Sequence, residues 1–512
     1  MAYISFLWHL HQPAYRTADG VAHAPWVLLH SGGAYLTLAR AIADTAGRGQ
    51  VVSIVPTLLE QLLAYREGNV IDPVAEALTT PAADLSHGQR ATVGEWASHM
   101  TSRQSARFPR LKELSGRPGN QLSVQQLRDL QLLTLLAHAG DAAWREPELA
   151  ELADRGHGFS RDDHERLAAW LREQPGRLVE AWRTIAALPE VEIATSPYAH
   201  PILPLLIDTG VVRDSWAPAP APEVPRFCRP EDASRQLAEG LAFMRRHGTA
   251  VAGCWPPEGA VSADAVAMYA DQGVRWLVTD EGVLDRSLGE PSRDAGAAHP
   301  ALYRPWQAPG SSPTLFFRDR ELSDRVGFVY GGWDDEGVAA LDLVRRLREL
   351  AARLPEEAAV VIALDGENPW PHYARGGGDF LRVLLDGLAD SGPELVPATL
   401  EDLAGRLAPA PLPRIHPGSW INAIFATWIG HPEKTAAWEL LARVRDAMPD
   451  GVVPPSLLLA EGSDWFWWLG EDNPTELAPL YDLIFRRHLA DACAQAGITP
   501  PVDLSRPLKS AD

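Results

Sequence analysis

Short apolar runs recur along this chain, and each of them ends in polar or chain-breaking residues. The runs are bounded too closely to be long helices, so each is interpreted as a buried strand. Between most of them, apolar residues recur at helical spacing, as in segments 231–246 and 338–353. Strands that alternate with helices pair in parallel through right-handed crossovers. The predicted strands span residues 3–8, 51–55, 191–194, 250–254, 274–278, 314–317 and 359–364.

This alternation predicts an α/β fold, in the form of a closed or nearly closed β/α barrel with its active site at the C-terminal ends of the strands. The segment of about residues 58–190 interrupts the alternation, because it is rich in Leu, Ala, Arg and Glu at helical spacing. We interpret it as a helical insertion over the barrel mouth, since a loop of that length does not stay unstructured in a compact domain. Ser123 and Ser160 are expected to cap helices, and Pro175-Gly176 to separate two of them. The predicted helices are 124–139, 161–173 and 177–188.

The chain is predicted to contain two domains. Residues 1–390 would form the barrel, and residues 391–512 a helical domain that completes the active site. No convincing strand pattern follows about residue 390, and segment 409–417 is a proline-rich connector. An aromatic cluster, DWFWWL, occupies residues 464–469 of the helical part.

Two acidic residues stand just past predicted strands. Glu258 follows a short strand and the sequence Trp255-Pro256-Pro257, in which the prolines end any sheet pairing. Asp365 directly follows the apolar run 360–364. Each could instead cap the next helix, but a pair of carboxyl groups at one end of a barrel is also what cleavage of a glycosidic bond requires. One carboxylate stays ionised as the nucleophile, and the other, in an apolar tryptophan-lined wall, has a raised pKa and donates a proton.

Composition excludes several other classes of function. The 512 residues carry a formal net charge of −21, which argues against binding the phosphate backbone of nucleic acid. The three cysteines form neither a disulfide framework nor a zinc-binding spacing. The N-terminal segment has no basic region followed by a long apolar run, and no segment is long enough to span a membrane. We therefore expect a cytoplasmic protein without nucleic-acid or membrane partners, and leave its oligomeric state open.

His9 and His11 flank one leucine at the end of the first predicted strand, so both imidazoles point to one face. They could ligate a metal ion or bind substrate hydroxyl groups. Zinc hydrolases with this pattern also need a carboxylated lysine or further histidines at later strand ends. Here no lysine lies near a strand end, and His200 is the only later strand-end histidine. We therefore predict no metal and no cofactor.

Five ordered motifs resemble the signatures of glycoside hydrolase family 57, and the resemblance spans most of the chain. The resemblance implies a (β/α)7 barrel, a helical region that completes the site, and retaining cleavage or transfer of α-glucans without a cofactor. Glu258 matches the family's nucleophile and Asp365 its acid/base. The motifs are HLHQP at 9–13, TSPYAHP at 195–201, WPPEG at 255–259, LDGEN at 364–368 and SWINAIFATW at 419–428.

The resemblance also implies substrate-binding roles. His9 and His11 match histidines that line the sugar subsite next to the nucleophile, and His200 matches the histidine of the second signature. Asp280 and Arg318, at the ends of neighbouring strands, are candidates for positioning, although a structural salt bridge explains each equally well. Four tryptophans could stack on glucose rings. Core packing is the alternative for Trp420 and Trp428, and for Trp438 we favour it. The four candidates are Trp255, Trp370, Trp420 and Trp428.

The sequence thus predicts a retaining glycosidase acting on α-glucans, most similar to the α-amylase and amylopullulanase members of the family. Pro257 and the pair Ile424-Phe425 depart from the pattern of many members, which leaves the choice between α-1,4 and α-1,6 bonds open. A 4-α-glucanotransferase or branching enzyme would use the same carboxylates. A metal-dependent hydrolase or deacetylase and a non-catalytic glucan-binding protein are the alternatives from other classes.

Overall fold

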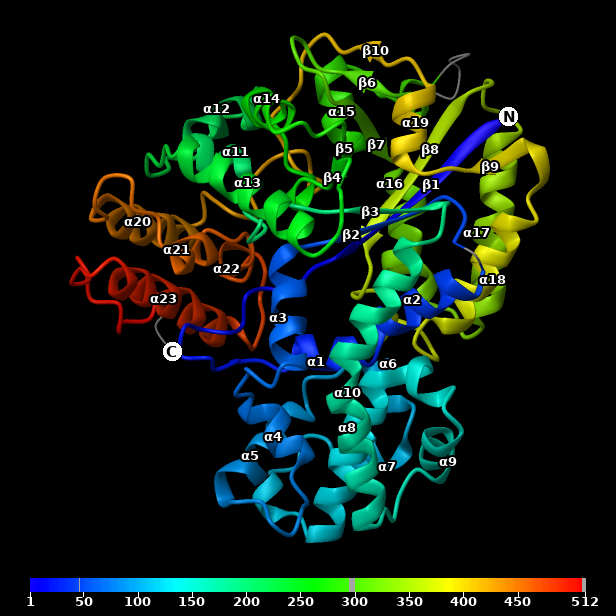
Figure 1. Cartoon of the computed structure of the whole chain (residues 1–512), viewed down its shortest axis with the longest axis vertical. Helices are drawn as coiled ribbons and strands as arrows, with labels where there is room; N and C mark the ends of the chain where they lie inside the picture. The colour runs from blue at the N-terminus through cyan, green and yellow to red at the C-terminus, as the bar shows by residue number, and fades with distance from the viewer. Residues whose placement is uncertain (46, 294–299, 509–512) are drawn as a thin grey trace.

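The first of two sheets is parallel and buried, and β1 lies at its centre. The computed structural model describes residues 1–45, 47–293 and 300–508 (Figure 1). In the sheet order β3-β2-β1-β8, every pair is parallel, and β9 pairs with the start of β1. Both faces of β1 are buried, which explains its nearly continuous apolar sequence. The strands are β1 Ala2–Leu10, β2 Gln50–Ile54, β3 Val191–Ala194, β8 Ala358–Asp365 and β9 Leu395–Pro397.

The second sheet holds the remaining strands in the order β10-β6-β7-β5-β4. Pairs β4–β5 and β5–β7 are parallel, whereas β6 runs antiparallel to β7. All seven predicted strands are thus confirmed as strands, although β4 is only two residues long. The strands are β4 Gly253–Cys254, β5 Trp276–Asp280, β6 Trp306–Gln307, β7 Thr314–Arg318 and β10 Ala410–Pro411.

Single backbone contacts join the edges of the two sheets. Between β3 and β4, Thr195 and Cys254 form a parallel bridge, and the Trp255 amide donates to the Thr195 carbonyl at 2.9 Å. Between β7 and β8, the Asp319 amide donates to the Val361 carbonyl at 2.8 Å. These contacts bring the C-terminal ends of strands from both sheets to one end of the molecule.

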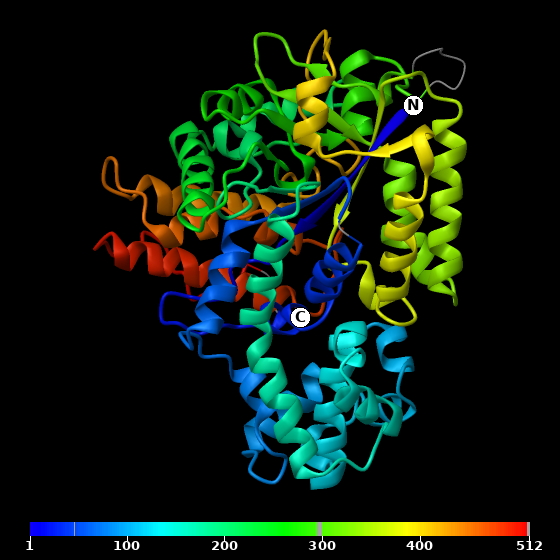
Figure 2. The same cartoon turned by 45° about the vertical axis from the view of Figure 1, so that its right-hand side comes forward.

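A group of helices lies between β2 and β3 in the chain, and most of it occupies the lower end of Figures 1 and 2, whereas α3 lies beside the strands. The predicted caps Ser123 and Ser160 are confirmed, each as a capping box. The predicted break at Pro175 is wrong, because α10 continues through this residue, whose neighbours Leu171 and Leu178 are buried and hold both halves in line. The helices are α3 Pro56–Arg66, α4 Pro73–Thr79, α5 His87–Trp96, α6 Ser102–Ala106, α7 Pro109–Leu114, α8 Val124–Trp144, α9 Pro147–Arg155 and α10 Arg161–Ala186.

Other helices flank the strands, and those after residue 430 form a separate layer in Figure 1. Early in the chain are α1 Trp26–Ser31 and α2 Ala34–Asp44. Along the middle are α11 Leu203–Ile207, α12 Val212–Trp216, α13 Pro230–Arg246, α14 Ala263–Asp271, α15 Glu281–Leu288, α16 Arg320–Asp324, α17 Glu336–Ala351, α18 Gly378–Ala389 and α19 Leu400–Arg406. The C-terminal layer contains α20 Pro432–Asp446, α21 Pro455–Ala460, α22 Asp464–Trp467 and α23 Ala478–Gln495.

The expectation that no strand follows residue 390 is wrong. Strands β9 and β10 come after this point and pair with β1 and β6. They are three and two residues long and end in proline, so they show no periodicity of their own and form only because neighbouring strands offer free edges. The division into domains at residue 390 stays a prediction.

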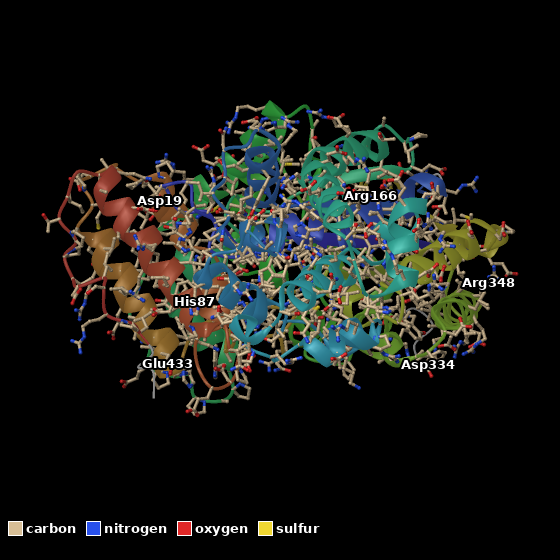
Figure 3. The ribbon with its side chains drawn as sticks, turned by 90° about the horizontal axis from the view of Figure 1, so that it is seen from below. Asp19, His87, Arg166, Asp334, Arg348 and Glu433 are labelled. Atoms are coloured by element: carbon tan, nitrogen blue, oxygen red, sulfur yellow. The ribbon has the colours of Figure 1, made fainter. Side chains whose placement is uncertain are left out.

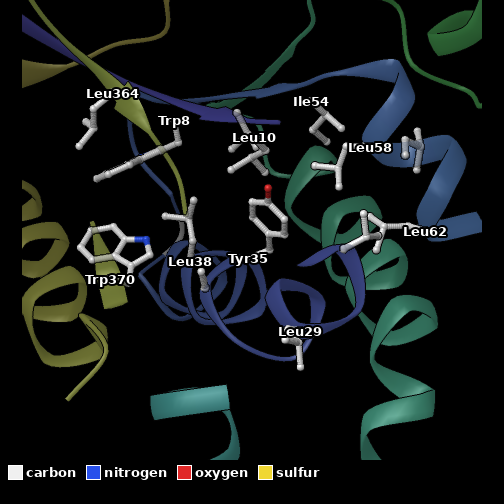
Figure 4. Packing of buried hydrophobic residues seen from close by; sticks show 14 of the residues in the cluster. Trp8, Leu10, Leu29, Tyr35, Leu38, Ile54, Leu58, Leu62, Leu364 and Trp370 are labelled. Carbon is white, nitrogen blue, oxygen red and sulfur yellow. The ribbon is translucent and has the colours of Figure 1, made fainter. Parts of the chain in front are cut away.

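The core lies against both faces of the first sheet. Trp8, Leu10 and Leu364 point from the strands toward α2 and the turn after β8, where they meet Leu38 and Trp370 (Figure 4). Charged side chains such as Asp19, Arg166, Asp334 and Arg348 lie at the periphery (Figure 3). No helix in the described part of the chain is long and apolar enough to cross a membrane.

Candidate active site

Glu258 stands in a strained turn after β4. Its backbone is left-handed, with φ 58° and ψ 24°, a conformation that costs free energy in residues other than glycine. The carboxyl group accepts hydrogen bonds on both oxygens: Trp420 Nε1 donates to Oε2 at 2.9 Å, and Ser463 Oγ donates to Oε1 at 3.3 Å. The Trp420 amide also donates to the Glu258 carbonyl at 2.9 Å. The side chain is therefore held by two segments that follow it by more than 150 residues.

Asp365 ends β8, and its register partner on β1 is His9. Asn368 Nδ2 donates to Asp365 Oδ2 at 2.7 Å, from within the same turn. The negative charge of Asp365 helps to raise the pKa of Glu258, so the two predicted catalytic carboxyl groups interact across the site. Both residues lie beside the same histidines, since His9 stands opposite Asp365 in the sheet, His9 Nε2 lies 3.0 Å from His200 Nε2, and His200 Nδ1 lies 3.8 Å from Glu258 Oε1.

Burial is the largest influence on both carboxyl groups. It raises the pKa of Glu258 well above its usual value, and the charges of Asp365 and Asp464 raise it further, against the hydrogen bonds from Trp420 and Ser463. Burial also raises the pKa of Asp365, whereas the Asn368 hydrogen bond and the neighbouring His11 and Arg318 side chains lower it. The expectation that only the proton donor has a raised pKa is therefore wrong for this site, because burial and two neighbouring carboxylates raise the pKa of Glu258, the predicted nucleophile, as well.

The three histidines lie together beside Glu258. His9 Nε2 and His200 Nε2 are 3.0 Å apart, and the rings of His11 and His200 stack with centroids 4.0 Å apart. His200 also has a left-handed backbone, with φ 58°. Burial lowers the pKa of His9 and of His200 well below the usual value, so both are neutral near pH 7. His9 and His200 thus place uncharged imidazole rings next to Glu258.

His11, His200 and Asp464 are the residues whose ligand atoms come within 4.8 Å of one another and could hold a metal ion. Their present contacts do not favour that role. His200 Nε2 lies against His9 and its Nδ1 lies 3.0 Å from Ser463 Oγ, while His11 Nε2 lies 3.0 Å from both oxygens of Asp464.

Asp280 and Arg318 form a buried salt bridge with each other. A structural salt bridge is the alternative to substrate positioning that the sequence offers for each of them. Arg318 Nε donates to Asp280 Oδ2 at 2.8 Å, and Asp280 is fully buried. Arg318 still reaches the site, because its guanidinium carbon lies 5.1 Å from the centre of the Trp420 ring. Asp280 instead caps α15 through the Gly282 amide and contacts no candidate catalytic group among the described residues.

Only one of the four candidate stacking tryptophans has an accessible face. Trp420 is partly exposed. Trp255 and Trp428 are 0% exposed and Trp370 is 2% exposed, so these three do not fit the prediction that they stack on sugar rings. Tryptophan has the largest apolar surface of any side chain, and here the tertiary packing uses it in the core. Trp438 is a core residue, as we favour from the sequence.

Ser463 and Asp464 were missed as site residues. Ser463 contacts Glu258 and His200, and Asp464 contacts His11. The sequence signal was weak, because these two polar residues simply introduce the aromatic cluster 464–469. They belong to the site because the C-terminal layer folds back over the strand ends.

Comparison with known proteins places this geometry in a family. The model of glycosyl hydrolase family 57 matches residues 5–415, and the chain therefore belongs to this family. The match includes every candidate site residue except Trp420, Trp428, Ser463 and Asp464. No curated protein sequence matches the chain.

Solved structures share the fold at low sequence identity. A GH57 branching enzyme from Thermococcus kodakaraensis is 17% identical, with a TM-score of 0.60, over 96% of this chain and 90% of that chain. An α-amylase from Thermotoga maritima is 15% identical, with a TM-score of 0.56, over 98% of each chain. A 4-α-glucanotransferase from Thermococcus litoralis is 13% identical, with a TM-score of 0.54, over 96% of this chain and 59% of that chain. At these identities the likeness concerns the fold.

Proposed function

We propose that this protein is a retaining glycosidase that acts on α-glucans. The observation that carries the proposal is the pair of interacting carboxyl groups at the C-terminal ends of β4 and β8. One of them, Glu258, receives a hydrogen bond on each oxygen. Family membership and the three stacked histidines next to this pair support it.

In the proposed reaction, Asp365 protonates the glycosidic oxygen while Glu258 attacks the anomeric carbon and forms a glycosyl ester. Water then attacks this carbon, with Asp365 now accepting the proton, and Glu258 leaves as a carboxylate. Both steps develop positive charge on the sugar ring, and this charge favours the ionised form of Glu258. In these transition states the ionised form of Glu258 is favoured and the proton remains with Asp365, where the leaving oxygen needs it.

We also propose that the strands of the two sheets act as a single β/α barrel, and that residues after 390 complete its active site. The backbone contacts at the Thr195–Cys254 and Asp319–Val361 edges support the first part. The contacts of Trp420 and Ser463 with Glu258 support the second. The helices between β2 and β3 touch the loops after β7 and β8, for example through Arg103, whose Nη2 donates to the Gly332 carbonyl at 2.9 Å.

Product analysis tests the proposal and separates it from glucan transfer. Purified protein is incubated with maltoheptaose and, separately, with pullulan, and the products are read by chromatography. Shorter sugars alone indicate hydrolysis, and maltotriose from pullulan adds α-1,6 cleavage. Longer and shorter sugars together indicate a transferase. Activity that is lost on treatment with EDTA, or the absence of any product, would contradict the proposal.

A further inference from the structure

The segment that carries Ser463 is fixed to the turn that carries His200. The Ser463 amide donates to the His200 carbonyl at 3.0 Å. A Cβ on Gly462 would lie 2.8 Å from the Ala199 carbonyl oxygen, so only glycine allows this close approach. The Gln236 side chain joins the same two segments, since its Oε1 accepts from the Ala199 amide at 3.0 Å and its Nε2 donates to the Leu458 carbonyl at 2.8 Å. The position of the Ser463 hydroxyl is therefore well determined.

A continuous chain of polar contacts runs through this hydroxyl to Glu258. Ser53 Oγ lies 3.5 Å from His9 Nδ1, and His9 Nε2 lies 3.0 Å from His200 Nε2. His200 Nδ1 lies 3.0 Å from Ser463 Oγ, which lies 3.3 Å from Glu258 Oε1. All five residues are at least nine-tenths buried, with Glu258 the most exposed at 9%.

The chemistry of these groups gives the chain a direction. A serine hydroxyl has one proton, and next to an ionised carboxylate it must donate that proton to Glu258. It must then accept from Nδ1–H of His200, which leaves Nε2 of this neutral ring as an acceptor. His9 consequently donates from Nε2 and accepts on Nδ1 from Ser53. Every proton in the chain then points toward Glu258.

We propose that Ser463 is a positioning residue for the nucleophile, and that the chain Ser53–His9–His200–Ser463 holds the Glu258 carboxylate in its ionised, attacking orientation. The inference rests on the proposed function for the role of Glu258 as nucleophile. It assigns to Ser463 Oγ one of the two hydrogen bonds that stabilise the carboxylate, the other coming from Trp420. In the glycosyl-enzyme, Oε2 or Oε1 becomes the ester oxygen, and the remaining donor binds the carbonyl oxygen.

Several charged groups face Glu258 and determine how strongly it depends on this bond. Asp365 from β8 and Asp464 from α22 both disfavour its ionised form, and burial acts in the same direction. His200, whose Nδ1 lies 3.8 Å from Oε1, is neutral and supplies no compensating charge. The cation Arg318 lies over Trp420 and favours ionised Asp365. The Trp420 and Ser463 bonds are therefore the main local support for the Glu258 carboxylate.

The test compares wild type with Ser463→Ala, Ser463→Cys and Ser456→Ala. Ser456 is a buried serine of the same layer whose hydroxyl accepts from Gln495 at 2.8 Å, so it controls for loss of a buried hydroxyl away from the site. The pH dependence of kcat/KM on maltoheptaose is measured for each protein. Separately, the protein is labelled with 13C-glutamate, and the Cδ resonance of Glu258, identified by its loss in Glu258→Gln, is titrated without substrate.

In Ser463→Ala, we expect both the Glu258 titration midpoint and the acid limb of kcat/KM to rise by about one pH unit. On the acid limb kcat falls by up to about tenfold, with a much smaller change in KM. In Ser463→Cys, whose thiol is a weak donor, both midpoints should lie between those of wild type and those of the alanine variant. Ser456→Ala leaves both midpoints in place.

An unchanged Glu258 midpoint and acid limb in Ser463→Ala would overturn the inference. If the alanine variant does not fold, as judged by circular dichroism, the same comparison is made with Ser463→Cys. Unchanged midpoints in the cysteine variant would then also overturn the inference. If wild type turns over no glucan, the proposed function fails, whereas the titration without substrate still decides whether Ser463 supports the Glu258 carboxylate.

Discussion

The turns after β4 and β8 place one carboxyl group each at the same end of the molecule, yet they are built differently. Asp365 ends a strand of eight residues, and its hydrogen-bond partner Asn368 belongs to the same turn. Glu258 follows a strand of two residues, adopts a left-handed backbone and is held by Trp420 and Ser463 from the C-terminal region. A local arrangement needs little tertiary support, whereas the strained one depends on distant segments.

The largest expected effect separates the roles of the two carboxyl groups. Glu258→Gln should lower kcat/KM by about 10³-fold or more on any α-glucoside, because the nucleophile is lost. Asp365→Asn should lower kcat/KM on maltoheptaose by about 10²–10⁴-fold, because the proton donor is lost. On 4-nitrophenyl α-maltoside, whose leaving group needs no proton, the Asp365 variant should recover most of this loss. Recovery by the Glu258 variant instead would reverse the two assignments.

Trp420→Phe tests the second hydrogen bond to the Glu258 carboxylate, which Trp420 Nε1 donates to Oε2. Loss of the indole N–H removes a bond that favours the ionised carboxylate, so the pKa of Glu258 rises and the acid limb of kcat/KM moves up by about one pH unit. Trp438→Phe is the matched control, because its Nε1 donates to the Trp428 carbonyl within the core. An equal shift in both variants would show a general effect of packing.

Asp464→Asn should act on Glu258 with the opposite sign. The charge of Asp464 raises the pKa of Glu258, so its removal lowers this pKa and moves the acid limb to lower pH. The asparagine keeps an oxygen for His11, and we expect kcat at pH 7 to change only by about two- to fivefold. Asp472→Asn, which alters a carboxylate paired with Lys434, serves as control. A shift to higher pH would contradict the assigned electrostatics.

The smallest effect is expected in the turn after β8, where Asn368 bonds to Asp365. Asn368→Ala removes the bond that lowers the pKa of Asp365, so this pKa rises further. Asp365 must be protonated to act as an acid, and it would then remain so to higher pH. The basic limb of kcat/KM should therefore move up by less than about one pH unit, without a change in the acid limb. Movement of the acid limb alone would mean that Asn368 stabilises the Glu258 carboxylate and not that of Asp365.

The sequence by itself determined the features that depend on neighbouring residues. Apolar runs with polar ends predicted the seven strands, and serines just before helical spacing predicted the caps at Ser123 and Ser160. Because parallel strands all place their C-terminal ends together, the strand pattern also predicted that Glu258 and Asp365 share one end of the fold.

The tertiary structure alone decided what depends on segments far apart in the chain. It formed β9 and β10 on free edges, continued α10 through Pro175, and buried the rings of Trp255, Trp370 and Trp428 in the core. It also brought Ser463 and Asp464 to the histidines and to Glu258. Contacts between residues that lie some 200 positions apart produce no local pattern in the sequence. Only the packed molecule therefore reveals which polar groups support the nucleophile.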